Sequence, residues 1–214
     1  MSVESLLHPV DEHPLRALRA FVQSARAEGA SERCAMCAVP IPSAHRHLVD
    51  TADRTIKCMC PHCHMLFSEP GAAVGRYRHI PTRHQRIAGF EVTQGEWDDL
   101  QIPVALAFFF RNSDQDRIVA FYPGPAGATE SLLPLDAWAR ITTRHPDLDD
   151  IEPDVEAVIV RRTDAESLAF IVPIDRCYEL TGRLRMHWSG FDGGREAAAA
   201  IDQFFDDVGA RADA

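Results

Sequence analysis

Five of the six cysteines of this 214-residue chain lie in one short stretch, between positions 34 and 63. They include two C-x-x-C knuckles, Cys34-Ala-Met-Cys37 and Cys60-Pro-His-Cys63. Two such knuckles can place four thiolates around one metal ion, because each knuckle turns its two sulfurs toward the same side. The sequence therefore predicts a small metal-binding module near the N-terminus.

The knuckles and their neighbours offer more ligands than one ion needs. The ligands expected for one zinc ion are Cys34, Cys37, Cys60 and Cys63. The distance between the knuckles is near the upper end of the roughly 15–20 residues usual in zinc ribbons. Cys58 lies two residues before Cys60 on an expected strand, so both should share a face, and either could be the third ligand. Cys58 could instead hold a second ion with His64 and one of His45 or His47.

A closed site of four thiolates favours a structural zinc ion that folds the module. Iron bound as in rubredoxin is the alternative, because thiolates also suit iron. Against iron, neither knuckle is followed by the glycine usual in rubredoxins. The surplus ligands leave a transferable or catalytic metal open, although His62 and His64 are expected as exposed loop residues.

Composition restricts the compartment and the partners. The chain has no run of about 18 apolar residues and no secretory type of N-terminus, so we expect no membrane insertion and a cytoplasmic location. Paired cysteines in that compartment are metal ligands more often than disulfides. The net charge is -10, with most acidic residues after position 95, which argues against general nucleic-acid binding.

Residues 76–86 form the one basic segment of the sequence. Its arginines are Arg76, Arg78, Arg83 and Arg86. They could dock on an acidic partner, hold two parts of the chain together, or belong to a solvated linker.

The order of elements predicts four units: an N-terminal helix in 1–30, a zinc-ribbon-like module in 31–68, a basic linker with a short helix in 69–100, and an α+β domain in 101–214. The N-terminal helix is expected over 14–29, where apolar residues recur at helical spacing. Short strands over 47–50 and 54–60 would form a hairpin between the knuckles. Thr93 and Glu96 have capping-box spacing, which predicts the short helix.

The α+β domain is predicted to use one pattern twice. Two apolar strands precede a helix in each half, and the expected ranges are 104–110, 118–122 and 133–143, then 155–160, 168–172 and 175–188. The expected core is therefore ββα-ββα, with four strands in one mostly antiparallel sheet. A C-terminal helix is expected after Gly193-Gly194.

A loop rich in proline and glycine lies between the second strand and the helix that follows it. Its residues Gly124, Ala126, Gly127 and Thr129 could expose backbone N–H groups to a phosphate, a carboxylate or a partner. The loop lacks the lysine of a P-loop and fits no dinucleotide fingerprint. An ordinary connection from strand to helix is the competing interpretation.

The cysteine-rich part of the chain contains three motifs: Cys34-x-x-Cys37, His45-Arg-His-Leu and Cys58-Met-Cys-Pro-His-Cys63. Five further segments follow them along the chain: 102–109, 120–131, 153–157, 172–178 and 188–194. Through them, nearly the whole chain beyond about residue 30 resembles a bacterial family without an established activity. Members of that family are often encoded beside nickel–iron hydrogenases of the actinobacterial, oxygen-tolerant type. The resemblance implies a hydrogenase-associated accessory protein and implies no mechanism.

We therefore expect a non-catalytic zinc-binding accessory protein that contacts a hydrogenase subunit or a maturation factor. No Ser-His-Asp set, H-E-x-x-H motif or paired-carboxylate pattern points to a reaction, and an enzyme would have its pocket at the Gly127 loop. The alternative is a rubredoxin-like iron electron carrier, or a metal-delivery protein, that serves the hydrogenase. The surplus ligands Cys58, His62 and His64 are the main support for that alternative.

Overall fold

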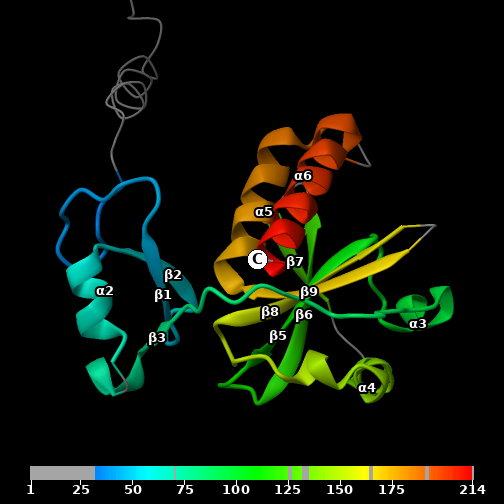
Figure 1. Ribbon diagram of the computed structural model, residues 1–214, viewed down its shortest axis with the longest axis horizontal. Helices are drawn as coiled ribbons and strands as arrows, with labels where there is room; N and C mark the ends of the chain where they lie inside the picture. The colour runs from blue at the N-terminus through cyan, green and yellow to red at the C-terminus, as the bar shows by residue number, and fades with distance from the viewer. Residues whose placement is uncertain are drawn as a thin grey trace, which may run out of the picture.

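A computed structural model describes residues 32–69, 71–124, 127–131, 135–163, 166–190 and 193–213. The helix expected over 14–29 lies outside the described residues. The described chain builds a sheet of three strands and a sheet of six, and the paired strands are antiparallel. Figure 1 shows two bodies side by side, joined by one extended segment. The prediction of an α+β protein with antiparallel strands is confirmed.

The smaller body, called the cysteine module below, comprises residues 32–69 and 71–79. Its hairpin pairs β1 (Arg46–Asp50) with β2 (Thr55–Met59), and β3 (Tyr77–His79) adds to β1. Helix α2 (Pro61–Phe67) and a 3-10 turn, η1 (Ala72–Gly75), complete it. The hairpin was predicted and the helix was not. The order knuckle, hairpin, helix therefore differs from the expected zinc ribbon, in which the second knuckle is a turn.

The larger body is built on a sheet in the order β4-β9-β8-β5-β6-β7. Its strands are β4 (Gln85–Arg86), β5 (Leu106–Asn112), β6 (Arg117–Gly124), β7 (Gly127–Ser131), β8 (Glu156–Arg162) and β9 (Ser167–Pro173). The four central strands are the predicted ones, but the prediction of a four-stranded sheet is wrong, because β4 and β7 extend both borders. Since β4 has two residues and β7 is a mostly exposed strand of small and polar residues, neither has the apolar alternation by which a strand is recognised.

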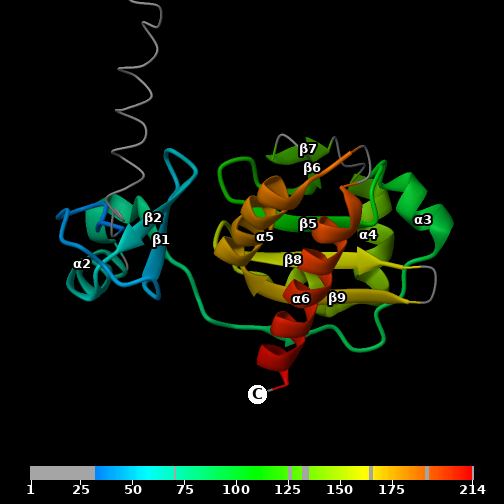
Figure 2. The same cartoon turned by 90° about the horizontal axis from the view of Figure 1, so that it is seen from above.

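Helices cover both faces of the large sheet. They are α3 (Gln94–Asp99), α4 (Leu135–Arg144), the 3-10 turn η2 (Pro146–Asp149), α5 (Ile174–His187) and α6 (Gly194–Ala212). In Figure 1, α5 and α6 lie above the sheet, α4 lies below it and α3 lies beside it at the right, and Figure 2 looks down on α5 and α6. None of the helices in the described residues is long and apolar enough to cross a membrane.

The predicted capping box at the start of α3 is present. The Thr93 hydroxyl accepts a hydrogen bond from the Glu96 N–H, and the Glu96 carboxylate accepts one from the Thr93 N–H at 2.9 Å. Each side chain thereby satisfies a backbone donor that the first helical turn leaves without a partner.

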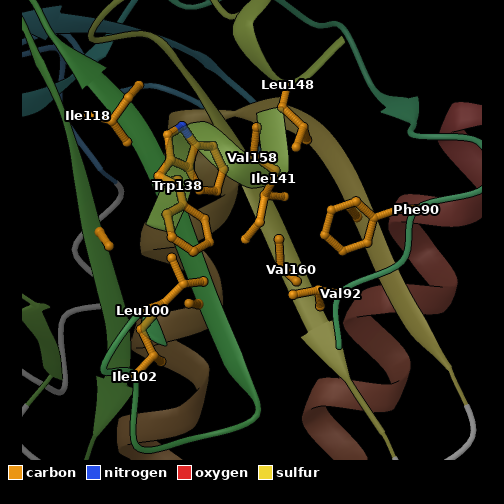
Figure 3. Close-up of a cluster of buried hydrophobic side chains, with 14 of the residues drawn as sticks. Phe90, Val92, Leu100, Ile102, Ile118, Trp138, Ile141, Leu148, Val158 and Val160 are labelled. Atoms are coloured by element: carbon orange, nitrogen blue, oxygen red, sulfur yellow. The ribbon is translucent and has the colours of Figure 1, made fainter. Parts of the chain in front are cut away.

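Alternate residues of the central strands enter two separate cores. Phe109 and Val158 pack toward α4, whereas Phe108 and Ile159 pack toward α5 and α6. Trp138 of α4 stacks on Phe109 with ring centroids 4.2 Å apart, and Figure 3 shows the core around it. Full burial of one such side chain stabilises a fold by about 1.5–3 kcal/mol, so two such cores supply the larger body with its stability.

The segment 69–92, which was expected to have little regular structure, joins the two sheets. Its β3 pairs Arg78 with Val49 in the cysteine module, and its β4 pairs Gln85 with Ile171 in the large sheet. Both strands are too short to be recognised by periodicity. The linker is therefore part of both bodies.

Candidate metal centre

The first knuckle is a tight turn held by its own backbone. The Ala38 N–H donates to the Cys34 carbonyl at 2.9 Å, and Ala38 has a φ of 58°, in the left-handed region that lets the chain reverse. The Ala35 N–H donates to the Cys58 carbonyl at 2.8 Å and ties the knuckle to β2. Cys34 and Cys37 are thereby held beside the end of the hairpin.

The second knuckle is the first turn of α2. Cys60 is the N-cap, and its Sγ accepts a hydrogen bond from the Cys63 N–H at 3.4 Å. Pro61 follows the cap, where its missing N–H costs nothing and its fixed φ favours a helix. The helical turn brings Cys60 and Cys63 to the same side.

The four knuckle cysteines lie together, and their Sγ atoms are all within 4.8 Å of one another. Cys37 Sγ lies 3.8 Å from Cys60 Sγ. A disulfide needs an S–S distance of about 2.05 Å. A tetrahedral zinc ion with Zn–S distances of about 2.3 Å separates its sulfurs by about 3.8 Å. This four-cysteine cluster therefore fits a tetrahedral ion and does not fit a disulfide pair.

Crowding separates the pKa values of Cys34 and Cys63. Burial tends to raise the pKa of Cys34, but hydrogen bonds from the backbone of Cys60, Cys37 and Met36 lower it to about 6. Burial, followed by hydrogen bonds with the neighbouring thiols, raises the pKa of Cys63 to about 12. The four sulfurs cannot all be thiolates at neutral pH unless a cation lies among them, and Zn²⁺ and iron are cations that four thiolates suit.

Cys58 belongs to a different group. The chain leaves β2 at Met59 and turns into α2 at Cys60, so the alternation that was expected to put Cys58 and Cys60 on one face ends there. Cys58 lies instead with His45 and His47, and one ligand atom of each residue is within 4.8 Å of the other two. The structure thus brings Cys60 to the four-cysteine cluster and Cys58 to a second cluster.

His64 is in neither cluster. Its Nε2 lies 3.1 Å from Nδ1 of His79 in β3, and its side chain is buried, contrary to the expectation of an exposed loop residue. Burial, followed by the charge of His79, lowers the pKa of His64. His62 is exposed, as expected. The proximity of His79 could not be foreseen, because it depends on the pairing of β3.

The predicted ligand loop is a hairpin in the structure. Gly124 and Gly127 are opposite each other at its end, and Thr129 pairs with Tyr122, while Ala126 lies outside the described residues. The expectation of a connection from strand to helix is wrong, because 127–131 form β7. Among the described residues of this loop, Gly124, Gly127 and Thr129 are therefore part of a strand pair.

Two of the predicted docking arginines join the two bodies. Arg78 donates to Asp154 at 3.0 Å, and Arg83 donates to the buried Glu156 carboxylate at 2.9 and 2.7 Å. The carboxylates belong to the larger body, whereas the arginines come from the segment that links it to the module. These contacts agree with the alternative that the segment holds two parts of the chain together, and docking on an acidic partner stays a prediction.

The other two arginines are also engaged within the chain. Arg76 forms two hydrogen bonds of 2.8 Å with the buried Asp50 carboxylate, and these bonds lower the pKa of Asp50. The Arg86 guanidinium lies over the Phe170 ring, 5.9 Å from its centroid, which is within the reach of about 6 Å of a cation–π contact. The basic segment is therefore a structural element of this fold.

Asp175 is a residue whose role the sequence did not indicate. It lies in the first turn of α5. Its Oδ2 is 2.8 Å from Nδ1 of His47 in the cysteine module. Since 128 positions separate the two residues, no local pattern could have linked them.

Comparison with known proteins found one family. No curated protein and no solved structure matches the chain. The model of a family of unknown function, DUF5947, matches residues 33–212. The match includes the four-cysteine cluster, the second cluster and the whole large sheet. Because it spans most of the sequence, the chain belongs to the DUF5947 family.

Proposed function

We propose that this is a non-catalytic zinc protein, in which the ion folds the cysteine module and the module contacts other proteins. The four-cysteine cluster is the observation that carries the proposal. Closed sites of four thiolates leave no position for a substrate and are usually structural.

The interior of the module supports a folding role for the ion. Its own core consists of Cys34, Ile41, Leu48, Met59 and Cys60, with a few partly buried neighbours. Two of these five residues are proposed zinc ligands. So small an apolar core does not stabilise a body of this size by itself, and bound zinc supplies the missing free energy of folding.

The surface of the module supports a role in contacts. Helix α2 exposes two large apolar side chains, Met65 at 65% and Leu66 at 66% of their full areas. Adjacent apolar side chains on a small exposed helix are a common feature of protein interfaces. The resemblance described above makes a nickel–iron hydrogenase subunit or a maturation factor the proposed partner, and the thiol ligands suit the reducing cytoplasm.

Metal analysis with a visible spectrum, on the full chain purified without added metal, tests the zinc proposal. We expect zinc, no visible absorption, and loss of that zinc in the Cys34→Ser, Cys63→Ser variant. Iron with thiolate charge-transfer bands would contradict the proposal and favour the rubredoxin-like electron carrier.

The contact role has its own test. The tagged full chain, produced in cells that assemble the hydrogenase, is expected to retain a hydrogenase subunit or maturation factor. The Met65→Glu, Leu66→Glu variant should lose that partner while keeping its zinc. Equal recovery by both proteins would refute a contact through α2, and recovery of neither partner by the unaltered chain would refute the hydrogenase assignment.

A further inference from the structure

We propose that His45, His47 and Cys58 form a second metal site, which leaves one coordination position open. The inference is independent of the proposed function, because it uses none of the four knuckle cysteines. It concerns a divalent ion of borderline softness, with Zn²⁺ as the type case, since two imidazoles and one thiolate suit such ions.

The hairpin register places the three donors on one face. His47 lies directly opposite Cys58 in the β1–β2 pair, so both side chains project to the same side. His45 precedes His47 by two residues, and the His45 and His47 rings meet edge to face with centroids 4.6 Å apart. With one ligand atom of each within 4.8 Å of the others, small shifts suffice to surround an ion.

The hydrogen bonds of His45 prepare it as a ligand. Its Nδ1 lies 2.9 Å from the Pro42 carbonyl, which can only accept, so Nδ1 carries the proton. In the neutral ring, Nε2 then holds the free lone pair. The side chain is only 6% exposed, and Nε2 is buried without a hydrogen-bond partner among the described residues. Buried polar atoms are rarely left in this state, and a metal ion would provide the missing partner.

His47 is prepared in the same way by a carboxylate. Its Nδ1 donates to Asp175 Oδ2 at 2.8 Å, which leaves Nε2 free. A carboxylate behind a ligating histidine fixes the ring orientation and increases the basicity of the nitrogen that binds the metal. Asp175 comes from α5, so an ion held here would connect the hairpin with the larger body.

The site opens to a surface hollow of about 510 Å³. His47 and Cys58 lie in its wall, together with Arg54, Tyr178 and Glu179. Three protein ligands, two of them beside open space, give the arrangement of exchangeable and catalytic zinc sites, in which water or a small ligand takes the fourth position. The four-cysteine cluster already offers four ligands, so it leaves no coordination position for water or a small ligand.

A nucleophilic triad of Cys58, His47 and Asp175 is the competing interpretation. It uses the same His47–Asp175 hydrogen bond but gives no role to His45 Nε2, which is buried without a hydrogen-bond partner among the described residues. The metal site accounts for all three donors, and alkylation of Cys58 separates the two interpretations.

Zinc stoichiometry of the full chain is the first test. In excess Zn²⁺, followed by removal of free metal, we expect two ions per chain for the unaltered protein and one for the His47→Ala, Cys58→Ser variant. The matched control is His62→Ala, which removes an exposed histidine of the same module and should keep two ions. One ion in the unaltered protein, or two in the double variant, would overturn the proposal. Retention of one ion by the double variant shows that the module is still folded.

Two further readouts address geometry and mechanism. Co²⁺ added to protein whose four-cysteine cluster already holds zinc should give visible bands of a tetrahedral ion at the second site. These bands should be absent in Cys58→Ser prepared in the same way, and their presence there would overturn the assignment. Asp175→Asn should weaken Zn²⁺ binding by about 10–100-fold without changing the stoichiometry, as expected for a positioning residue. Zn²⁺ should also protect Cys58 from iodoacetamide, and rapid alkylation in the presence of Zn²⁺ would favour the triad instead.

Discussion

The two bodies of this chain are stabilised in different ways. The larger one has apolar cores on both faces of a six-stranded sheet. The cysteine module has its own core of five residues, two of which are proposed metal ligands, and a buried Asp50 paired with Arg76. Its Val49 is buried in a core of the larger body. If the proposed zinc site is present, we expect the module to depend on its ion, on charge pairs and on the packing of Val49 against the larger body, whereas the larger body depends on hydrophobic burial.

Removal of the ion should have the largest effect and should act on one body only. In the Cys34→Ser, Cys63→Ser variant, we expect the module to unfold because structural zinc binding supplies folding free energy. Hydrogen exchange and limited proteolysis should report loss of protection in 32–79 and little change after 101. The control is Cys177→Ala, in the larger body, which should keep the metal. Full protease resistance of the module in the double variant would refute a structural site.

Cutting the chain tests where the larger body begins. A fragment of 101–213 lacks Ile87, Phe90, Val92, Trp97 and Leu100, all buried in the core against α4. Since each is worth about 1.5–3 kcal/mol, we expect that fragment to be unfolded. The longer fragment 81–213 retains them and should fold. Thermal unfolding followed by circular dichroism compares the two fragments. A cooperative unfolding transition in fragment 101–213 would contradict the prediction.

A single core substitution should damage the larger body without releasing the metal. Phe109 is fully buried and stacks on Trp138, so Phe109→Ala should lower the free energy of unfolding by about 3–5 kcal/mol. Phe110, on the same strand, is only partly buried and serves as the control with a smaller loss. Urea denaturation measures both. Equal losses would show that burial does not determine the stability of this sheet.

The ion pair between the linker and the larger body should contribute less. Glu156 has a side chain only 4% exposed, and Arg83→Ala would leave it without its main partner. We expect a loss of about 1–3 kcal/mol from the free energy of unfolding. Arg86→Ala removes a neighbouring arginine without an ion pair in the described chain and should have little effect. If both variants lose the same amount, the Glu156 contact is not the cause.

The smallest effect should appear in acid. Hydrogen bonding to Arg144, followed by the capping box, lowers the pKa of Glu96 to about 2. Because the folded-state pKa is below the ordinary value, this carboxylate stabilises the fold above about pH 4.5, and the contribution is lost as the pH falls toward 2. Glu96→Gln should therefore lower the free energy of unfolding at pH 7. It should also reduce the difference in free energy of unfolding between pH 7 and pH 3. An unchanged pH dependence would contradict the role of this contact.

Local patterns predicted the elements that are defined by local physics. The hairpin over 46–59, the capping box at Thr93 and the four central strands have their own turn, cap or periodicity signals. The start of α2 had a signal as well, because Pro61 suits the first helical position, but Cys60-Pro61 also suits a knuckle that is a turn. The border strands β4 and β7 had none, because they are short or mostly exposed.

The candidate sites divide in the same way. The four-cysteine cluster follows from spacing along the chain. The second cluster was foreseen only in part, with His64 included as a ligand, because its composition depends on which face of the hairpin each side chain occupies. The pairing of Arg83 with Glu156 and of His47 with Asp175 depends on tertiary structure, which no single segment of the sequence encodes.

The two residues of β4 have one more consequence. They cover the middle of β9 by pairing with Phe170 and Ile171, so the main-chain groups there are satisfied within the chain. An uncovered strand of this kind is a template on which another copy can add. Any cleavage or local unfolding that removes β4 would therefore leave β9 as an unpaired edge strand and make the protein prone to self-association. The short segment between the two bodies thus also protects the protein from aggregation.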